Sequence, residues 1–164
     1  MSTLYVDTIN EKTSGNGIYI PGHIGQIKKT AYITGEQSTT SSSFSDITGA
    51  SLSITPNSTS SVILIGWTGI LGGSGGFRFL KDGTALHTPT NTYQYYDTDT
   101  NSQTNWKSSS NRARFHEQVF DEPATTSVIT YKVKFARYTS TGFGINESGI
   151  VREGSILYLM EIGG

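Results

Sequence analysis

The run from Val62 to Leu71, VILIGWTGIL, constrains the fold of this chain more than any other stretch of its sequence. It is short and almost continuously apolar, with turn-forming residues before it and GGSGG after it. Its length and its β-branched residues favour a strand over a helix. We therefore predict a central strand here. The glycine-rich residues 72–76 lack the lysine and helix of a phosphate-binding loop, and we expect a flexible connection between strands.

Other segments also have strand patterns. Residues 128–138 alternate cleanly, with Tyr131, Val133 and Phe135 on one face. Residues 76–87 have the pattern of a hairpin around a Lys81–Thr84 turn. The other predicted strands are residues 24–34, 44–54 (with a bulge at Thr48–Gly49), 112–120, 143–145 and 155–162. No segment has a helical pattern that its neighbours support, so the sequence predicts an all-β, antiparallel β-sandwich, with a jelly roll as the favoured form.

Composition limits the function further. The chain has 164 residues, 15% of them charged, and it has 21 Ser and 23 Thr, which suits a β-protein with hydroxyl-rich surfaces. A net charge of −1 gives no electrostatic reason to expect nucleic acid or an anionic membrane as a partner. The absence of cysteine excludes disulfides, a thiol nucleophile and a Cys-based zinc site. With no signal-peptide pattern and no apolar run of membrane-spanning length, we expect cytoplasmic synthesis and no membrane insertion.

The N-terminal residues differ from the rest of the chain. Their apolar side chains stand singly or in pairs, separated by SGNG and PG, and short strands of this kind do not form a stable hairpin alone. We therefore divide the chain into a β-stalk or attachment segment, residues 1–23, and a sandwich domain, residues 24–164. We expect the stalk to pack against copies of itself in other chains. The side chains assigned to that assembly are Leu4, Val6, Ile9, Ile18 and Ile20.

The string VDTINEKTSGNGIYI, residues 6–20, resembles a stalk motif of tail-fibre and other appendage proteins of tailed bacteriophages. Residues 43–65 and 154–164 resemble the first and last strands of the small β-sandwich tips on such appendages. The resemblance implies a homotrimeric structural protein on the surface of a virion. It implies attachment to other virion proteins through the N-terminal segment, and a tip that presents loops to a host surface glycan or protein.

The best candidates for receptor or glycan binding are aromatic residues in the polar segment 88–110. Amphipathic rings beside amide and hydroxyl groups suit sugar faces and protein surfaces. The alternative is that some of these rings fix the segment onto the sandwich. The candidates are Tyr93, Tyr95, Tyr96 and Trp106.

Other chemistry has weaker support. Asp97, Asp99 and Asn101 have the spacing of a calcium loop, but Ser102 replaces the required glycine, so we interpret the segment as a polar loop. The three histidines, His23, His87 and His116, are far apart in sequence, and His23 fits a turn better than a metal site on a three-fold axis. We expect no metal and no cofactor.

Catalysis also has little support. The sequence has no nucleophile elbow, and Asp121–Glu122 before Pro123 fits a solvated turn. We therefore expect a protein that is not an enzyme. Three alternatives stay open: a capsid decoration or head-fibre protein without receptor binding, a free lectin-like binding module, and a polysaccharide-processing enzyme with two carboxylates in a groove.

Overall fold

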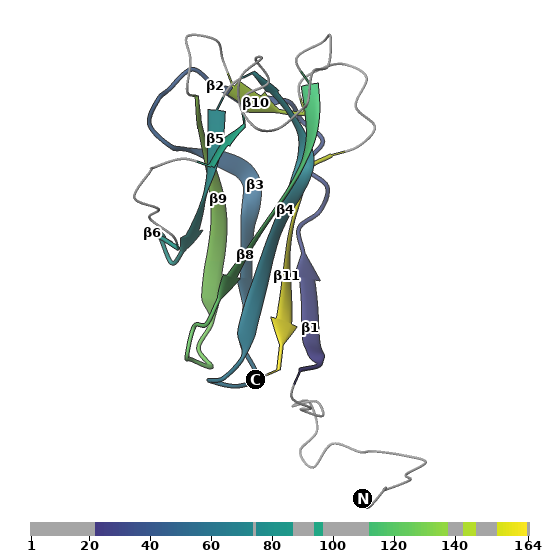
Figure 1. Cartoon of the computed structure of the whole chain (residues 1–164), viewed down its shortest axis with the longest axis vertical. Helices are drawn as coiled ribbons and strands as arrows, with labels where there is room; N and C mark the ends of the chain where they lie inside the picture. The colour runs from purple at the N-terminus through teal and green to yellow at the C-terminus, as the bar shows by residue number, and fades with distance from the viewer. Residues whose placement is uncertain are drawn as a thin grey trace, which may run out of the picture.

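The computed structural model describes residues 22–73, 75–86, 94–96, 112–137, 143–146 and 154–163, which form a β-sandwich of antiparallel strands (Figure 1). The predicted all-β class is confirmed. None of these segments contains a helix that is long and apolar enough to cross a membrane. The strands are β1 (Ile24–Lys29), β2 (Gln37–Thr39), β3 (Ser45–Ile54), β4 (Val62–Gly73), β5 (Gly75–Lys81), β6 (Thr84–Ala85), β7 (Gln94–Tyr96), β8 (Arg112–Asp121), β9 (Ile129–Arg137), β10 (Phe143–Ile145) and β11 (Ile156–Ile162).

One layer, which we call the β4 sheet, is built around the strand predicted to be central. β4 pairs with β8 along most of its length. On its other side β4 pairs first with β11 and then with β10. β1 flanks β11 and β2 flanks β10, so β1 and β8 are the two edges of the sheet at the end where the chain enters.

The second layer, which we call the β9 sheet, has the order β3–β9–β5, with β6 and β7 both paired to β5. Four of the strand pairs are nested in sequence: β1 with β11, β3 with β9, β4 with β8, and β5 with β7. In sequence, each pair therefore lies between the two strands of the pair before it.

Two local features that were predicted from the sequence, a hairpin and a bulge, are present. The hairpin between β5 and β6 turns at Asp82 and Gly83, both with positive φ. The predicted bulge in β3 is present: the register shifts between Asp46 and Ser51, and Gly49 has a φ of +87°.

Two predictions about strand ends are wrong. β4 and β5 extend into the glycine-rich segment predicted to be a connection, because Gly72, Gly73, Gly75 and Gly76 all pair in ladders. The first strand ends at Lys29 rather than at Thr34, and Ile33 makes a single bridge with Ser155 instead.

The core lies between the two sheets. Trp67 of β4 is fully buried, and its ring contacts the rings of Phe77 and Phe115 at centroid distances of 5.9 and 5.6 Å. Tyr131, Val133 and Phe135 of β9 point into this core, as their alternation predicts. Burial of each large side chain contributes about 1.5–3 kcal/mol, so the sandwich described here has a core of its own.

Candidate functional site: the outer face of the β4 sheet

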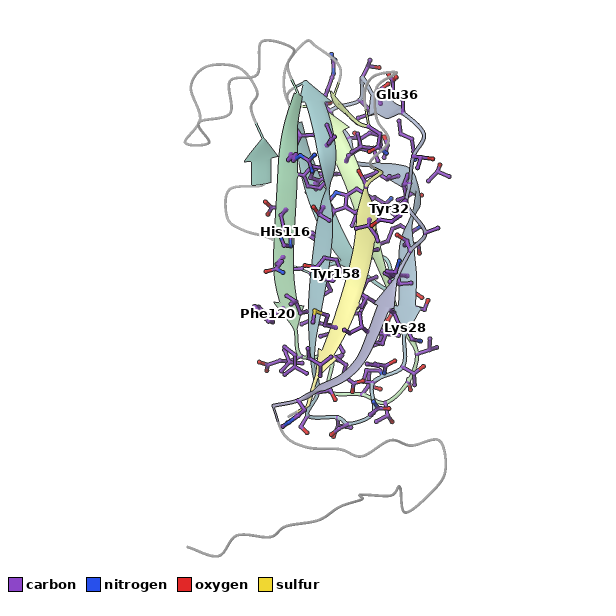
Figure 2. All side chains as sticks on the ribbon, turned by 90° about the vertical axis from the view of Figure 1, so that its right-hand side faces the viewer. Lys28, Tyr32, Glu36, His116, Phe120 and Tyr158 are labelled. Atoms are coloured by element: carbon purple, nitrogen blue, oxygen red, sulfur yellow. The ribbon has the colours of Figure 1, made fainter. Side chains whose placement is uncertain are left out.

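Two rows of apolar side chains cross the outer face of the β4 sheet at the end where β1 begins. The strand register and the alternation of buried residues place the members of each row side by side. We call these seven residues the apolar face. One row contains Ile27, Met160, Leu64 and Phe120, and the other contains Ile24, Ile162 and Val62. Figure 2 looks onto the β4 sheet, with β8, β4, β11 and β1 side by side and Phe120 labelled on β8.

The apolar face is open to solvent in the single chain. Ile27 is 60% exposed, Phe120 58% and Ile24 53%. Leu64, Met160, Val62 and Ile162 are each partly exposed. A single exposed apolar residue is normal on a protein surface, but a contiguous patch of them marks an interaction site.

The outer faces of the two sheets differ in the side chains that their strands carry. Along β9, buried residues alternate with Thr130, Lys132 and Lys134, which face solvent and bind polar groups of β3. The hydrogen bond from Lys134 lowers the pKa of the Asp46 carboxyl. β4 and β11 are apolar on both faces instead, which is the pattern of strands covered on both sides.

Tyr158 lies on the outer face of the β4 sheet, one row farther along the strands than Met160 and Leu64. A Cβ atom at Gly66 would be 2.0 Å from Cζ of Tyr158, so the ring covers the glycine. Nε2 of Gln118 donates a hydrogen bond of 2.7 Å to the Tyr158 hydroxyl, and Nε2 of His116 lies 2.8 Å from the same oxygen. Tyr158 and His116 are labelled in Figure 2. This polar group spans β11, β4 and β8.

Farther along the same face is a hollow of about 440 Å³. Its walls combine a phenol, a guanidinium, a hydroxyl and glycine backbone with two isoleucines. The residues that line it are Tyr32, Thr68, Gly69, Ile70, Arg114, Gly154 and Ile156.

The acidic residue Asp121 does not lie in a solvated turn, and that prediction is wrong. Asp121 is the last residue of β8, and its side chain contacts two residues of the β9 sheet. Nζ of Lys81 lies 2.9 Å from Oδ2, and the Tyr131 hydroxyl donates to the same oxygen at 2.7 Å. Burial and this hydrogen bond raise the pKa of Tyr131. The carboxylate holds the two layers together.

A second carboxylate, Glu161, is buried at the end of the molecule where β1 begins. It accepts hydrogen bonds from the backbone and side-chain amides of Asn57, the hydroxyl of Ser61 at 2.6 Å and the amide of Gln26 at 2.6 Å. These four bonds join β1, β11 and the connection between β3 and β4. Asp121 and Glu161 therefore both hold strands together.

The predicted binding residues are only partly within the described structure. Tyr95 and Tyr96 belong to β7, where they pair with Gly76 and Gly75. Tyr93, Trp106 and the calcium-like residues 97–102 lie outside the described residues. So do His87 and the predicted stalk residues Leu4, Val6, Ile9, Ile18 and Ile20.

The histidines that can be placed are far from one another. His23 lies in an exposed turn before β1, and His116 lies on the outer face of β8. Within the described ranges, no three His, Asp or Glu side chains are grouped closely enough to hold a metal ion.

The sequence analysis did not identify the apolar face. The signal was present: residues 62–71 and 155–162 are apolar at both odd and even positions, although one antiparallel face is normally polar. That pattern was used only to predict a central strand at residues 62–71 and the last strand at residues 155–162. Comparison of the chain with protein-family models and with curated proteins finds no match.

Proposed function

We propose that the protein is a structural component of a bacteriophage virion: a homotrimeric fibre or appendage with an N-terminal attachment segment and a β-sandwich tip. The observation that carries this proposal is the order of the parts. The motif at residues 6–20 is followed directly by a small β-sandwich that begins at β1, which is the arrangement of the appendage proteins that the motif resembles.

The nested pairing of strands supports the more specific proposal that the sandwich is a jelly roll. Such folds wrap paired strands into two antiparallel sheets. Here the first and last strands of the sandwich are neighbours, and three further pairs lie within them.

A non-catalytic role is part of the proposal. Asp121 is bound by Lys81 and Tyr131, and Glu161 by hydrogen bonds that include one from Ser61, so neither is free to act as an acid or base in a groove. A glycosidase mechanism would need two accessible carboxyl groups at a defined separation. We propose that the tip instead binds a host surface glycan or protein.

The proposal is tested on purified phage particles. Mass spectrometry should detect the chain in the particles, and gold-labelled antibody against the chain should mark an appendage in electron micrographs. The label also shows whether the protein is on the tail or the head. If the chain is absent from particles that were assembled while it was being produced, the virion role is excluded.

The receptor role has a separate test. Purified protein, added to host cells before phage, should reduce adsorption in proportion to its concentration. If saturating protein leaves adsorption unchanged while the chain is present in the virion, a decoration or head-fibre role without receptor binding replaces the receptor role.

A further inference from the structure

We infer that the apolar face is the surface through which copies of this chain contact one another. This inference rests on the proposed homotrimer and assigns its contact to the sandwich, whereas the sequence analysis assigned it to the N-terminal segment. The partner is a second copy of the chain, whose own apolar face or neighbouring edge lies against these two rows.

The composition of the apolar face indicates that it is covered by another surface. Seven apolar side chains lie in two neighbouring rows, and no charged side chain lies in either row. The outer face of the β9 sheet has Asp46 between Lys132 and Lys134 at corresponding positions. The two faces of one sandwich therefore differ, and only the face of the β4 sheet has the character of an interior surface.

The sequences of the strands beneath the apolar face also indicate that it is covered. β4 and β11 have the near-continuous apolar sequence of strands that are covered on both sides. Within the described part of the chain, the β9 sheet covers only one side. The outer side of β4 and β11, which carries the apolar face, is not covered by any of the described residues.

The two rows cross four strands about 4.8 Å apart, and each row takes about 6.6 Å along the strands, so together they cover about 250 Å². A stable protein interface buries about 800 Å² of each partner. The two rows therefore have the size of the apolar centre of such an interface, and the polar residues of the β4 sheet around them would form its rim.

The position of the face favours a second copy over another partner. The two rows lie at the end of the sandwich where β1 begins, immediately after the N-terminal segment (Figure 1). Contact through this face brings the N-terminal segments of neighbouring copies to the same end of the assembly, as a shared stalk requires. The charged pair Lys28 and Lys29 on β1 disfavours association by strand pairing at that edge of the sheet.

The experiment compares three single substitutions in the full-length chain by light scattering at a series of protein concentrations. Ile27→Glu and Phe120→Glu change the apolar face. Val128→Glu is the matched control, because Val128 is 66% exposed and lies between β8 and β9, outside both rows. All three side chains are exposed in the single chain, so each variant should fold, which circular dichroism verifies.

We expect a wild-type mass three times that of the 17.8 kDa chain. The control should have the same mass, and the two face variants should dissociate to folded single chains. The concentration for half-dissociation should rise at least about 100-fold, because an unpaired carboxylate would be buried in the contact.

Other outcomes separate this inference from the proposed function. If the wild type and both face variants are equally trimeric, the contact lies elsewhere and the inference is wrong, while the trimeric appendage stands. A wild type that is a single chain at every concentration overturns both the inference and the trimeric appendage, and the apolar face is then covered by residues 1–21 of the same chain or by a different protein. A wild-type dimer that Ile27→Glu dissociates supports the face but excludes the three-fold appendage.

Discussion

The ring of Tyr158 lies directly over Gly66, in the space that a side chain at that position would fill. The two residues are opposite each other in the β4–β11 ladder. With no Cβ below it, the ring can lie flat across the sheet, and its hydroxyl reaches His116 and Gln118 on β8. The glycine therefore allows one side chain to link three strands on the surface that we assign to subunit contact.

Gly66→Ala should displace this ring. The new Cβ would be 2.4 Å from the Tyr158 hydroxyl oxygen, so the ring must turn away and lose both hydrogen bonds. We expect a net destabilisation of about 1 kcal/mol, since two partly exposed hydrogen bonds are lost and the lower backbone entropy of alanine offsets part of the loss. Urea unfolding at fixed protein concentration measures it.

The control for this change is Gly35→Ala, where an added Cβ would have no atom within 4 Å. Its stability should be within about 0.5 kcal/mol of the wild type. If Gly66→Ala is as stable as Gly35→Ala, the ring of Tyr158 has another equally good position, and the contact with Gly66 does not determine the arrangement.

The sequence predicts those parts of the fold where a single strand carries the whole signal. The alternation of Tyr131, Val133 and Phe135 identifies both β9 and its buried face. The run at residues 62–71 identifies β4, and Asp82–Gly83 identifies a hairpin turn. In these segments the conformation and the buried face can be predicted from the residues of the segment itself.

The sequence does not predict features that depend on pairing between distant strands. Ile27, Leu64 and Phe120 form one row only because β1, β4 and β8 have a particular register, and they are far apart in sequence. The environment of Asp121 likewise depends on Lys81 and Tyr131 in the other sheet. The glycine-rich residues 72–76 were predicted to connect strands, yet Gly72, Gly73, Gly75 and Gly76 pair with β8, β9 and β10.

Asp121→Ala should weaken the contact between the two sheets. It removes the acceptor of the Tyr131 hydroxyl and the partner of Lys81, and Tyr131 is almost fully buried. We expect a loss of about 2–3 kcal/mol, because a buried donor would remain without a partner. Thermal unfolding measures it, with Glu122→Gln on the next, exposed residue as the control. Equal unfolding temperatures for the two variants would contradict the structural role of Asp121.

Glu161→Gln should loosen the end of the sandwich where β1 begins. The amide keeps the shape of the side chain but loses the charge, and its NH₂ group would face donors from Asn57, Ser61 or Gln26. We expect a destabilisation of about 2 kcal/mol, as for hydrogen bonds to a charged group. Hydrogen exchange should accelerate in β1 before it does in β9. Glu36→Gln, at an exposed site, should leave both rates unchanged.

Glu117→Gln should change how stability depends on pH. Burial raises the pKa of the Glu117 carboxyl from 4.5 to about 7. The folded chain therefore holds this proton more tightly than the unfolded chain, and the stability from Glu117 falls as pH rises between 4.5 and 7. Below pH 4.5 the penalty is absent, and above pH 7 it is complete. Glutamine does not titrate, so the variant should be more stable than the wild type at pH 8, by about 1 kcal/mol after solvent screening is allowed for. The two should converge at pH 4. Urea unfolding across this range measures the difference, and parallel curves for the two proteins would exclude the raised pKa of Glu117.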